Sequence, residues 1–382
     1  MIRLFASLLF LCSFLSCQSQ HATVVTGAEQ IETLTHKLKN KRVALVVNHT
    51  AVIGKTHLAD TLKNLGINSI RIFGPEHGFR GEAADGEHVN DSIDVKSGIP
   101  IVSLYGKNRK PTSQQLSDID IVVFDIQDVG ARFYTFISTM HYVMEACAEN
   151  KKKLIILDRP NPNAFVDGPL NTTPFKSFVA MHPIPIAHGL TVGELAHMIN
   201  GEGWLTNKLK CDVDVVKLKN WKHSDDYLLP IKPSPNLPNN QAIRLYPSLC
   251  LFEGTVISLG RGTQSPFQVL GNPELKNMQY QFTPVTIKGV ATKPSHENKI
   301  CFGLDLRNVS VSRKIDLSYL LQLYKAYPDK EKFFLPYFDI LAGTTVLKQQ
   351  IIDGLTEEEI SMSWKKDLDI YNEMRKKYLL YP

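Results

Sequence analysis

The segment RVALVVN (42–48) is a nearly uninterrupted apolar run, and it points to the fold class of the chain. Such a run is typical of a parallel β-strand that helices cover on both faces, because none of its side chains then faces water. The next segment, HLADTLKNLG (57–66), has helical apolar spacing and ends in Gly66, a residue type that commonly caps helices. We therefore expect a strand followed by a helix near the start of the folded chain.

Strand-like and helix-like segments continue to alternate through the N-terminal half of the chain. Strands are predicted at 69–73, 99–106, 118–130, 152–160 and 211–218, and helices near 135–149 and 189–200. This alternation predicts an α/β fold with a Rossmann-like, doubly wound parallel sheet. Beyond the proline-rich segment 229–238, strands at 283–290 and 299–309 and helices near 316–327, 343–352 and 356–378 predict a smaller α+β domain. We place the first domain at 24–235 and the second at 236–382.

The N-terminal segment MIRLFASLLFLCSFLSC (1–17) carries Arg3 and then an apolar run too short to span a membrane with ordinary flanks. It is typical of a signal peptide, which we place at 1–16. Its end, Phe-Leu-Ser-Cys, resembles a bacterial lipobox, which implies cleavage before Cys17, lipidation of Cys17 and a short tether at 17–23. The alternative is a plain secretory signal with a chance cysteine. The lipobox predicts a lipid-anchored protein of the cell envelope, and we favour the periplasmic side.

Composition excludes several classes of protein. The 382 residues are 43% hydrophobic and 21% charged, with a net charge of +5, which is ordinary for a globular protein. The basic runs at 39–42 and 151–153 lie beside predicted strands and are interpreted as solvated turns, so no nucleic-acid partner is expected. The four cysteines that follow Cys17 are widely spaced and favour buried free thiols over disulfides.

Polar side chains follow five of the predicted strands. The carboxyl ends of parallel strands meet at one edge of a sheet, where ligands bind in open α/β folds, so we expect these side chains to converge. The residues concerned are Asn48, Glu76, His77, Tyr105, Asp125, Gln127, Asp158 and Arg159.

The most crowded of these strand ends is FGPEHGFRGEAADGEHV (73–89), which holds four carboxylates, two histidines and four glycines. There is no HExxH motif and no pair of cysteine or histidine ligands at metal spacing, so no metal site is expected. There is no GxGxxG, no Walker loop and no GxSxG, which argues against a nucleotide cofactor and a serine nucleophile. What remains is carboxylate chemistry supported by histidine and arginine.

Cleavage of a glycosidic bond fits that chemistry, because it needs a carboxyl group that protonates the leaving oxygen. Glu76, positioned between a proline and a histidine, suits this acid, and Glu253, Asp125 or Asp128 could supply a second carboxylate. Arg132 and Arg261 suit a substrate that carries a carboxylate, although each could equally be a structural ion-pair partner. His188 lies in a segment predicted as a loop before a helix, and its alternative role is packing.

Eight motifs between about residues 40 and 273 resemble, in order, the exo-β-N-acetylmuramidase family of glycoside hydrolases (NamZ-type). They are GPEHGFRGE, SLYG with KPT, DIQDVGARFYTFISTM, LDRPNP, IPIAHGLTVGELA, PSPNLP, YPSLCLFEGT and GRGTQSPFQ. The resemblance implies a Rossmann-like catalytic domain, a smaller C-terminal domain that completes a cleft, and no metal or nucleotide cofactor. It implies removal of N-acetylmuramic acid from the non-reducing ends of peptidoglycan fragments. It carries over Glu76 and His77 from the PEHG motif and Glu253 from the FEGT motif.

Two departures from the family pattern are visible. Ala164 and Phe165 replace a common glycine pair, and Ala187 replaces a usual arginine. The expected substrate carries a lactyl carboxylate, which gives arginines a purpose, and we expect substrate contacts from Asn48, Tyr105, Asp125, Gln127, Arg132, Asp158, Arg159, His188 and Arg261. The second catalytic group is left open between Glu253, Asp125 and the acetamido group of the substrate. The rival functions are a non-catalytic lipoprotein that binds wall fragments and an amidase or esterase.

Overall fold

The structure is a computed structural model that describes residues 23–76, 78–80, 91–106 and 108–382. The predicted signal peptide, the lipidation site Cys17 and the histidine His77 lie outside the described residues. No helix in the described part of the chain is both long enough and apolar enough to cross a membrane.

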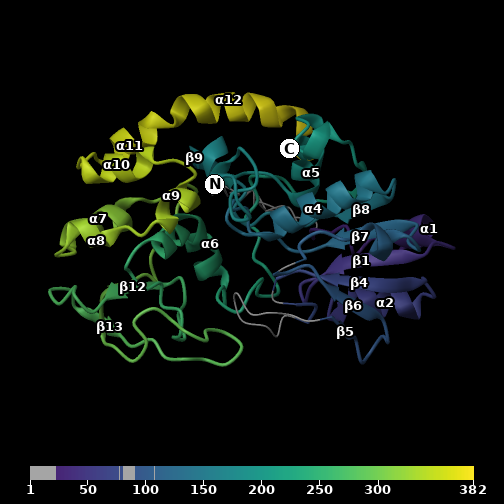
Figure 1. The fold of residues 1–382 in the computed structure, drawn as a ribbon, viewed down its shortest axis with the longest axis horizontal. Helices are drawn as coiled ribbons and strands as arrows, with labels where there is room; N and C mark the ends of the chain where they lie inside the picture. Colours follow the sequence, from purple (N-terminus) through teal and green to yellow (C-terminus); the bar gives the residue numbers. More distant parts are fainter. Residues whose placement is uncertain (1–22, 77, 81–90, 107) are drawn as a thin grey trace, which may run out of the picture.

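The N-terminal domain is built on a seven-stranded sheet of strand order β11-β8-β7-β1-β4-β6-β5 (Figure 1). Its parallel strands are β1 (Val43–Val47), β4 (Ser69–Gly74), β6 (Pro100–Ser103), β7 (Ile121–Asp125), β8 (Lys153–Leu157) and β11 (Asp212–Val216), and the edge strand β5 (Ser92–Ile93) is antiparallel to β6. The chain starts in the centre, adds strands on one side and then on the other. This is the doubly wound order of Rossmann-like folds, so the predicted fold class is confirmed.

Helices cover both faces of this sheet, which explains the uninterrupted apolar run of β1. Val43, Leu45 and Val47 pack into one core with the helices α1 (Ile31–Leu38) and α2 (Leu58–Asn64). Ala44 and Val46 point the other way, into a second core with α4 (Phe136–Glu149) and α5 (Val192–Gly201). All five side chains are fully buried, and burying a valine or leucine is worth about 1.5–3 kcal/mol.

Smaller elements connect the sheet strands. They are β2 (Val52–Ile53), β3 (Thr56–His57), α3 (Ser113–Leu116), β9 (Val166–Leu170), η1 (Thr173–Phe175), β10 (Pro185–His188) and η2 (Thr206–Lys208). The prediction of a loop before α5 was wrong for 185–188, because β10 pairs antiparallel with β9 in a two-stranded sheet. The prolines at 183 and 185 obscured this strand, since proline removes a backbone donor and is usual only at strand edges.

The C-terminal part is a smaller α+β domain, as predicted. It contains a three-stranded antiparallel sheet of order β12-β14-β13, made of Val269–Asn272, Cys301–Asp305 and Tyr280–Phe282. Its helical elements are α6 (Asn240–Leu249), η3 (Cys250–Gly254), α7 (Ser318–Ala326), α8 (Lys330–Phe333), α9 (Tyr337–Ala342), α10 (Val346–Ile352), α11 (Glu357–Ser363), α12 (Lys365–Arg375) and η4 (Lys376–Tyr378).

Two predicted elements of this domain were wrong. The strand expected at 283–290 is irregular, because Ile287 and Ala291 pair across a tight turn in which Gly289 has a φ of 73°. The single helix expected at 356–378 is interrupted at Trp364, which ends α11 and begins α12. Trp364 is buried and donates from Nε1 to Asp167 Oδ1 over 3.1 Å, so a tertiary contact fixes the break.

The two domains form one continuous core, and the end of the chain returns to the first domain. In Figure 1, α12 runs along the top of the molecule from the C-terminal domain towards the sheet. Tyr371 on α12 donates to the His188 carbonyl over 2.8 Å, and Arg375 donates to the Gly189 carbonyl over 2.6 Å. The four cysteines that follow Cys17 are buried and free, as predicted. The hydrogen bonds of Tyr371 and Arg375 thus join the C-terminal helix to the first domain.

Candidate active site

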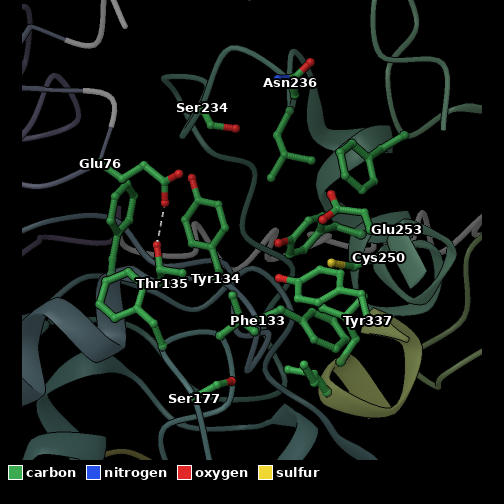
Figure 2. A pocket seen from close by; sticks show the side chains of 18 of the residues that line it. Glu76, Phe133, Tyr134, Thr135, Ser177, Ser234, Asn236, Cys250, Glu253 and Tyr337 are labelled. Carbon is green, nitrogen blue, oxygen red and sulfur yellow. Dashed lines mark hydrogen bonds between the residues drawn. The ribbon is translucent and has the colours of Figure 1, made fainter. Parts of the chain in front are cut away.

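A cavity of about 460 Å³ lies between the two domains, and side chains from both line it (Figure 2). This volume is within the range of small-molecule binding sites. The lining residues come from the loops after β4 and β6, the entry to α4, the segments 177–179 and 234–237, the end of α6 with η3, the loop before β12, and α9.

Glu76 reaches this cavity from the end of β4. The strand ends at Gly74, and the chain turns through Pro75, whose carbonyl accepts from the Gly78 amide over 2.9 Å. Gly78 has a φ of 74°, which a residue with a side chain adopts only at a cost. Thr135, just before α4, donates from Oγ1 to Glu76 Oε2 over 2.7 Å, so a contact from a separate element orients the half-buried carboxyl group.

Glu253 reaches the cavity from the other domain and lies on the opposite side from Glu76 in Figure 2. Its Oε1 lies 2.6 Å from Arg261 Nη2, and the two side chains are 23% and 24% exposed. A Cβ on the next residue, Gly254, would lie 2.3 Å from the Cα of Phe338. The glycine therefore allows α9 to pack directly on η3, which brings Tyr337 to the cavity wall.

Aromatic rings form much of the cavity wall. Eight of the lining residues are aromatic: Tyr105, Phe133, Tyr134, Phe136, Phe178, Tyr246, Phe267 and Tyr337. Tyr246 is central among them, because its ring centroid lies 5.7 Å from that of Tyr134 and 5.1 Å from that of Phe267, both edge to face. Burial raises the pKa of Tyr246 well above its ordinary value, so its hydroxyl stays neutral.

The cavity brings together four of the residues that the sequence singled out: Glu76, Tyr105, Glu253 and Arg261. Glu76 and Tyr105 follow neighbouring strands, whereas Glu253 and Arg261 come from the second domain. His77 lies outside the described residues. Placing these side chains in one cavity does not test their chemical roles, which stay predictions.

Five other strand-end residues, Asn48, Asp125, Gln127, Asp158 and Arg159, are buried and do not line the cavity. Arg159 donates two hydrogen bonds, of 2.5 and 2.9 Å, to the carboxylate of Asp125. Gln127 donates to the Pro160 carbonyl over 2.7 Å. At the sheet edge where Rossmann folds usually bind a dinucleotide, these side chains are therefore hydrogen-bonded within the protein. None of these five residues lines the cavity, and the substrate contacts expected of them stay predictions.

Arg132 and His188 also lie away from the cavity. Arg132 is fully buried and donates to the carbonyls of Pro169, Ile184, Leu341 and Ala342 over 2.7–2.9 Å. Burial lowers the pKa of Arg132 to about 9. Its side-chain hydrogen bonds all go to backbone carbonyls. His188 is buried too, with Nε2 3.5 Å from Asp128 Oδ2. Both side chains join segments of the fold.

Sequence reasoning missed Arg109 and Thr135, both of which line the cavity. Arg109 lies between the SLYG and KPT segments. Its position just after a predicted strand was the sequence signal that could have identified it as a site residue. Within the described part of the chain, no group of three His, Cys, Asp or Glu side chains is arranged to hold a metal ion. The expectation of metal-free chemistry stays a prediction.

A Rossmann-like domain joined to a second domain at an aromatic cavity with two carboxylates is an arrangement suited to a glycoside hydrolase. The comparison with protein families agrees with this class. Residues 43–241 match the N-terminal domain, and residues 244–381 the C-terminal domain, of the family described as exo-beta-N-acetylmuramidase NamZ. The chain belongs to this family, which confirms the predicted resemblance and makes the protein a glycoside hydrolase.

Individual relatives span nearly the whole chain. The peptidoglycan beta-N-acetylmuramidase NamZ of Bacillus subtilis (strain 168) is 40% identical over 370 residues, which cover 90% of this chain and 88% of that protein. Two crystal structures of DUF1343 family proteins from Bacteroides fragilis NCTC 9343 share the fold. The first has a TM-score of 0.89 at 47% identity and the second 0.80 at 32%, each covering 94% of this chain and 99% of the other.

Proposed function

We propose that this protein is an exo-acting hydrolase that releases terminal β-linked N-acetylmuramic acid from peptidoglycan fragments. The observation that carries the proposal is the placement of Glu76 and Glu253 on opposite sides of one aromatic cavity. Family membership and the activity named for the Bacillus subtilis relative support it. Aromatic rings suit a sugar, whose faces carry C–H groups that pack on an apolar surface.

In the proposed reaction, Glu76 is the general acid. It gives its proton to the glycosidic oxygen as the bond from that oxygen to the anomeric carbon breaks. A water molecule then bonds to that carbon and releases its extra proton to a carboxylate of the cavity, which completes the hydrolysis. Thr135 already donates to Glu76 Oε2, so the transferable proton belongs on Oε1. In this way Thr135 fixes which oxygen faces the leaving group.

The second group in the reaction is either Glu253 or the acetamido group of the substrate. Glu253 lies across the cavity from Glu76, with Arg261 holding one of its oxygens. If the acetamido oxygen attacks the anomeric carbon instead, Glu253 is placed to polarise that group. Asp125 is less suited to either role, because both of its oxygens bind Arg159.

The test is turnover of a chromogenic N-acetylmuramic acid β-glycoside by the mature protein. Glu76→Gln and Glu253→Gln are compared with Glu373→Gln, an exposed control on α12. We expect turnover by the parent protein and the control, and a loss of at least about a hundredfold in kcat for Glu76→Gln. Saturable binding without turnover by the parent protein would favour the rival reading as a binding lipoprotein. Full activity of Glu76→Gln would remove Glu76 from the chemistry.

We also propose that Cys17 carries a lipid anchor in the cell envelope, where peptidoglycan fragments occur. The support is the lipobox-like sequence around Cys17. Detergent phase partitioning of cell fractions tests it: the parent protein should partition with the detergent, and Cys17→Ser should not. Aqueous partitioning of both would contradict the anchor and leave the proposed reaction untouched.

A further inference from the structure

We propose that Arg109 binds the lactyl carboxylate of the substrate and so determines the preference for N-acetylmuramic acid over N-acetylglucosamine. The two sugars differ only in the lactyl ether on O3, which carries the carboxylate. The inference rests on the proposed function, because it concerns how the same cavity chooses its sugar.

The cavity offers few cations to a ligand. Among the described residues that line it, only Arg109 and Arg261 carry a positive charge. Arg261 is already committed to Glu253, with Nη2 2.6 Å from Oε1. Arg132, the other arginine expected to meet a carboxylate, is fully buried against four backbone carbonyls. Arg109 is therefore the guanidinium best placed to bind the carboxylate of a ligand.

An aromatic ring holds Arg109 in place. Its guanidinium carbon lies 4.2 Å from the ring centroid of Phe178. Within the described part of the chain, the neighbouring Lys110 forms ion pairs with Glu145 and Glu149, whereas Arg109 forms none. Phe178 is itself stacked on Tyr142, with centroids 6.3 Å apart and planes 13° from parallel. Ser138 on α4 donates to the Phe178 carbonyl over 2.7 Å, which ties this platform to the helix.

This arrangement suits recognition of a carboxylate. A guanidinium that stacks on a ring uses its face, while its N–H donors point outward in its own plane. Two parallel N–H donors match the two oxygens of a carboxylate. Arg109 is exposed, so it can exchange water for a ligand at the edge of the cavity. The sugar ring would then lie between Arg109 and Glu76, which line the same cavity.

The experiment measures both turnover and binding. For turnover, kcat/KM is determined on matched chromogenic β-glycosides of N-acetylmuramic acid and N-acetylglucosamine. For binding, calorimetry gives the Kd of each free sugar. The variants are Arg109→Gln and Arg109→Lys, with Arg307→Gln as control. Arg307 is also an exposed arginine whose guanidinium carbon lies over an aromatic ring, 5.6 Å from the centroid of Tyr280, but it is not among the cavity residues.

We expect Arg109→Gln to lower kcat/KM on the muramic acid glycoside at least about tenfold, mainly through KM, and to weaken the Kd of N-acetylmuramic acid similarly. Its Kd for N-acetylglucosamine should not change, and Arg109→Lys should keep part of the preference. Turnover by the parent protein with no effect of Arg109→Gln would overturn this inference alone. A parent protein that neither cleaves nor binds the muramic acid sugars would overturn the proposed function and this inference with it.

Discussion

Arg132 donates a hydrogen bond to the carbonyl oxygen of Ala342 over 2.8 Å, and this contact joins the loop before α4 to the C-terminal end of α9. A second Nη2 bond, 2.7 Å long, reaches the Leu341 carbonyl. The last carbonyls of a helix lack partners within the helix and carry the negative end of its dipole, so a buried cation suits this position. The contact sets where α9 meets the cavity.

Replacing Arg132 should therefore cost both stability and cavity geometry. Arg132→Met removes the donors and leaves four buried carbonyls without them, so we expect the free energy of unfolding to fall by about 3 kcal/mol or more. Urea denaturation measures this change. Arg42→Gln, which removes an exposed ion pair with Asp120, should cost far less stability, because water and salt screen exposed charges. An Arg132→Met protein as stable as the parent would show that the carbonyls find other partners.

Thr135 should act on catalysis through the orientation of Glu76. In Thr135→Val the shape of the side chain is kept, but the hydrogen bond to Glu76 Oε2 is lost. We expect kcat to fall roughly ten- to a hundredfold while KM changes little, because the contact orients an acid rather than binding the sugar. Thr135→Ser, which keeps the hydroxyl, should recover most of kcat. Equal losses in both variants would point to packing instead.

Much of the N-terminal fold could be predicted because its signals are local. The run at β1 and the cap at Thr191, which accepts from the Glu194 amide, depend on neighbouring residues. The break at Trp364 could not be predicted, because it depends on Asp167, nearly two hundred residues earlier in the chain. Sequence periodicity carries no information about such a contact.

The site was predictable only in part, for a similar reason. Polar residues at strand ends were recognised, but a sequence does not say whether they meet a ligand or one another. Asp125 and Arg159 satisfy each other, whereas Glu76 faces the cavity. The contact between Thr135 and Glu76 spans 59 residues of sequence and has no local signature.

The buried histidine pair should make the protein less stable in acid. His141 Nδ1 lies 3.1 Å from His182 Nε2, and both rings are almost fully buried. Burial lowers the pKa of His141 to about 4 and that of His182 well below its ordinary value, while Glu145 raises the pKa of His141, and Lys110 and Lys176 lower it.

Because both histidine pKa values are lowered in the folded protein, acid should destabilise it. The unfolded chain takes up protons below pH of about 6.5, whereas the folded pair resists them, so stability is lost as pH falls from about 6.5 towards 4. Between pH 7 and 5 the loss from His141 alone is about 2 kcal/mol. Urea midpoints at the two pH values measure it, and His141→Gln should show a smaller fall. An equal fall in both proteins would place the acid sensitivity elsewhere.

The C-terminal tail should stabilise the first domain through Tyr381. Its hydroxyl donates to Asp158 Oδ2 over 2.6 Å and accepts from the Leu218 amide over 2.9 Å, at a site where both side chains are buried. Tyr381→Phe leaves that amide without its acceptor and the carboxylate without one donor, so we expect a loss of about 1–3 kcal/mol. Tyr378→Phe is the matched control and should cost less, because the Tyr378 hydroxyl bonds Glu202 in a partly exposed place.

Hydrogen exchange separates the two variants: Tyr381→Phe should speed exchange of the Leu218 amide and of its neighbours in β11, and Tyr378→Phe should not. Unchanged protection at Leu218 would mean that the tail rests on the sheet without holding it.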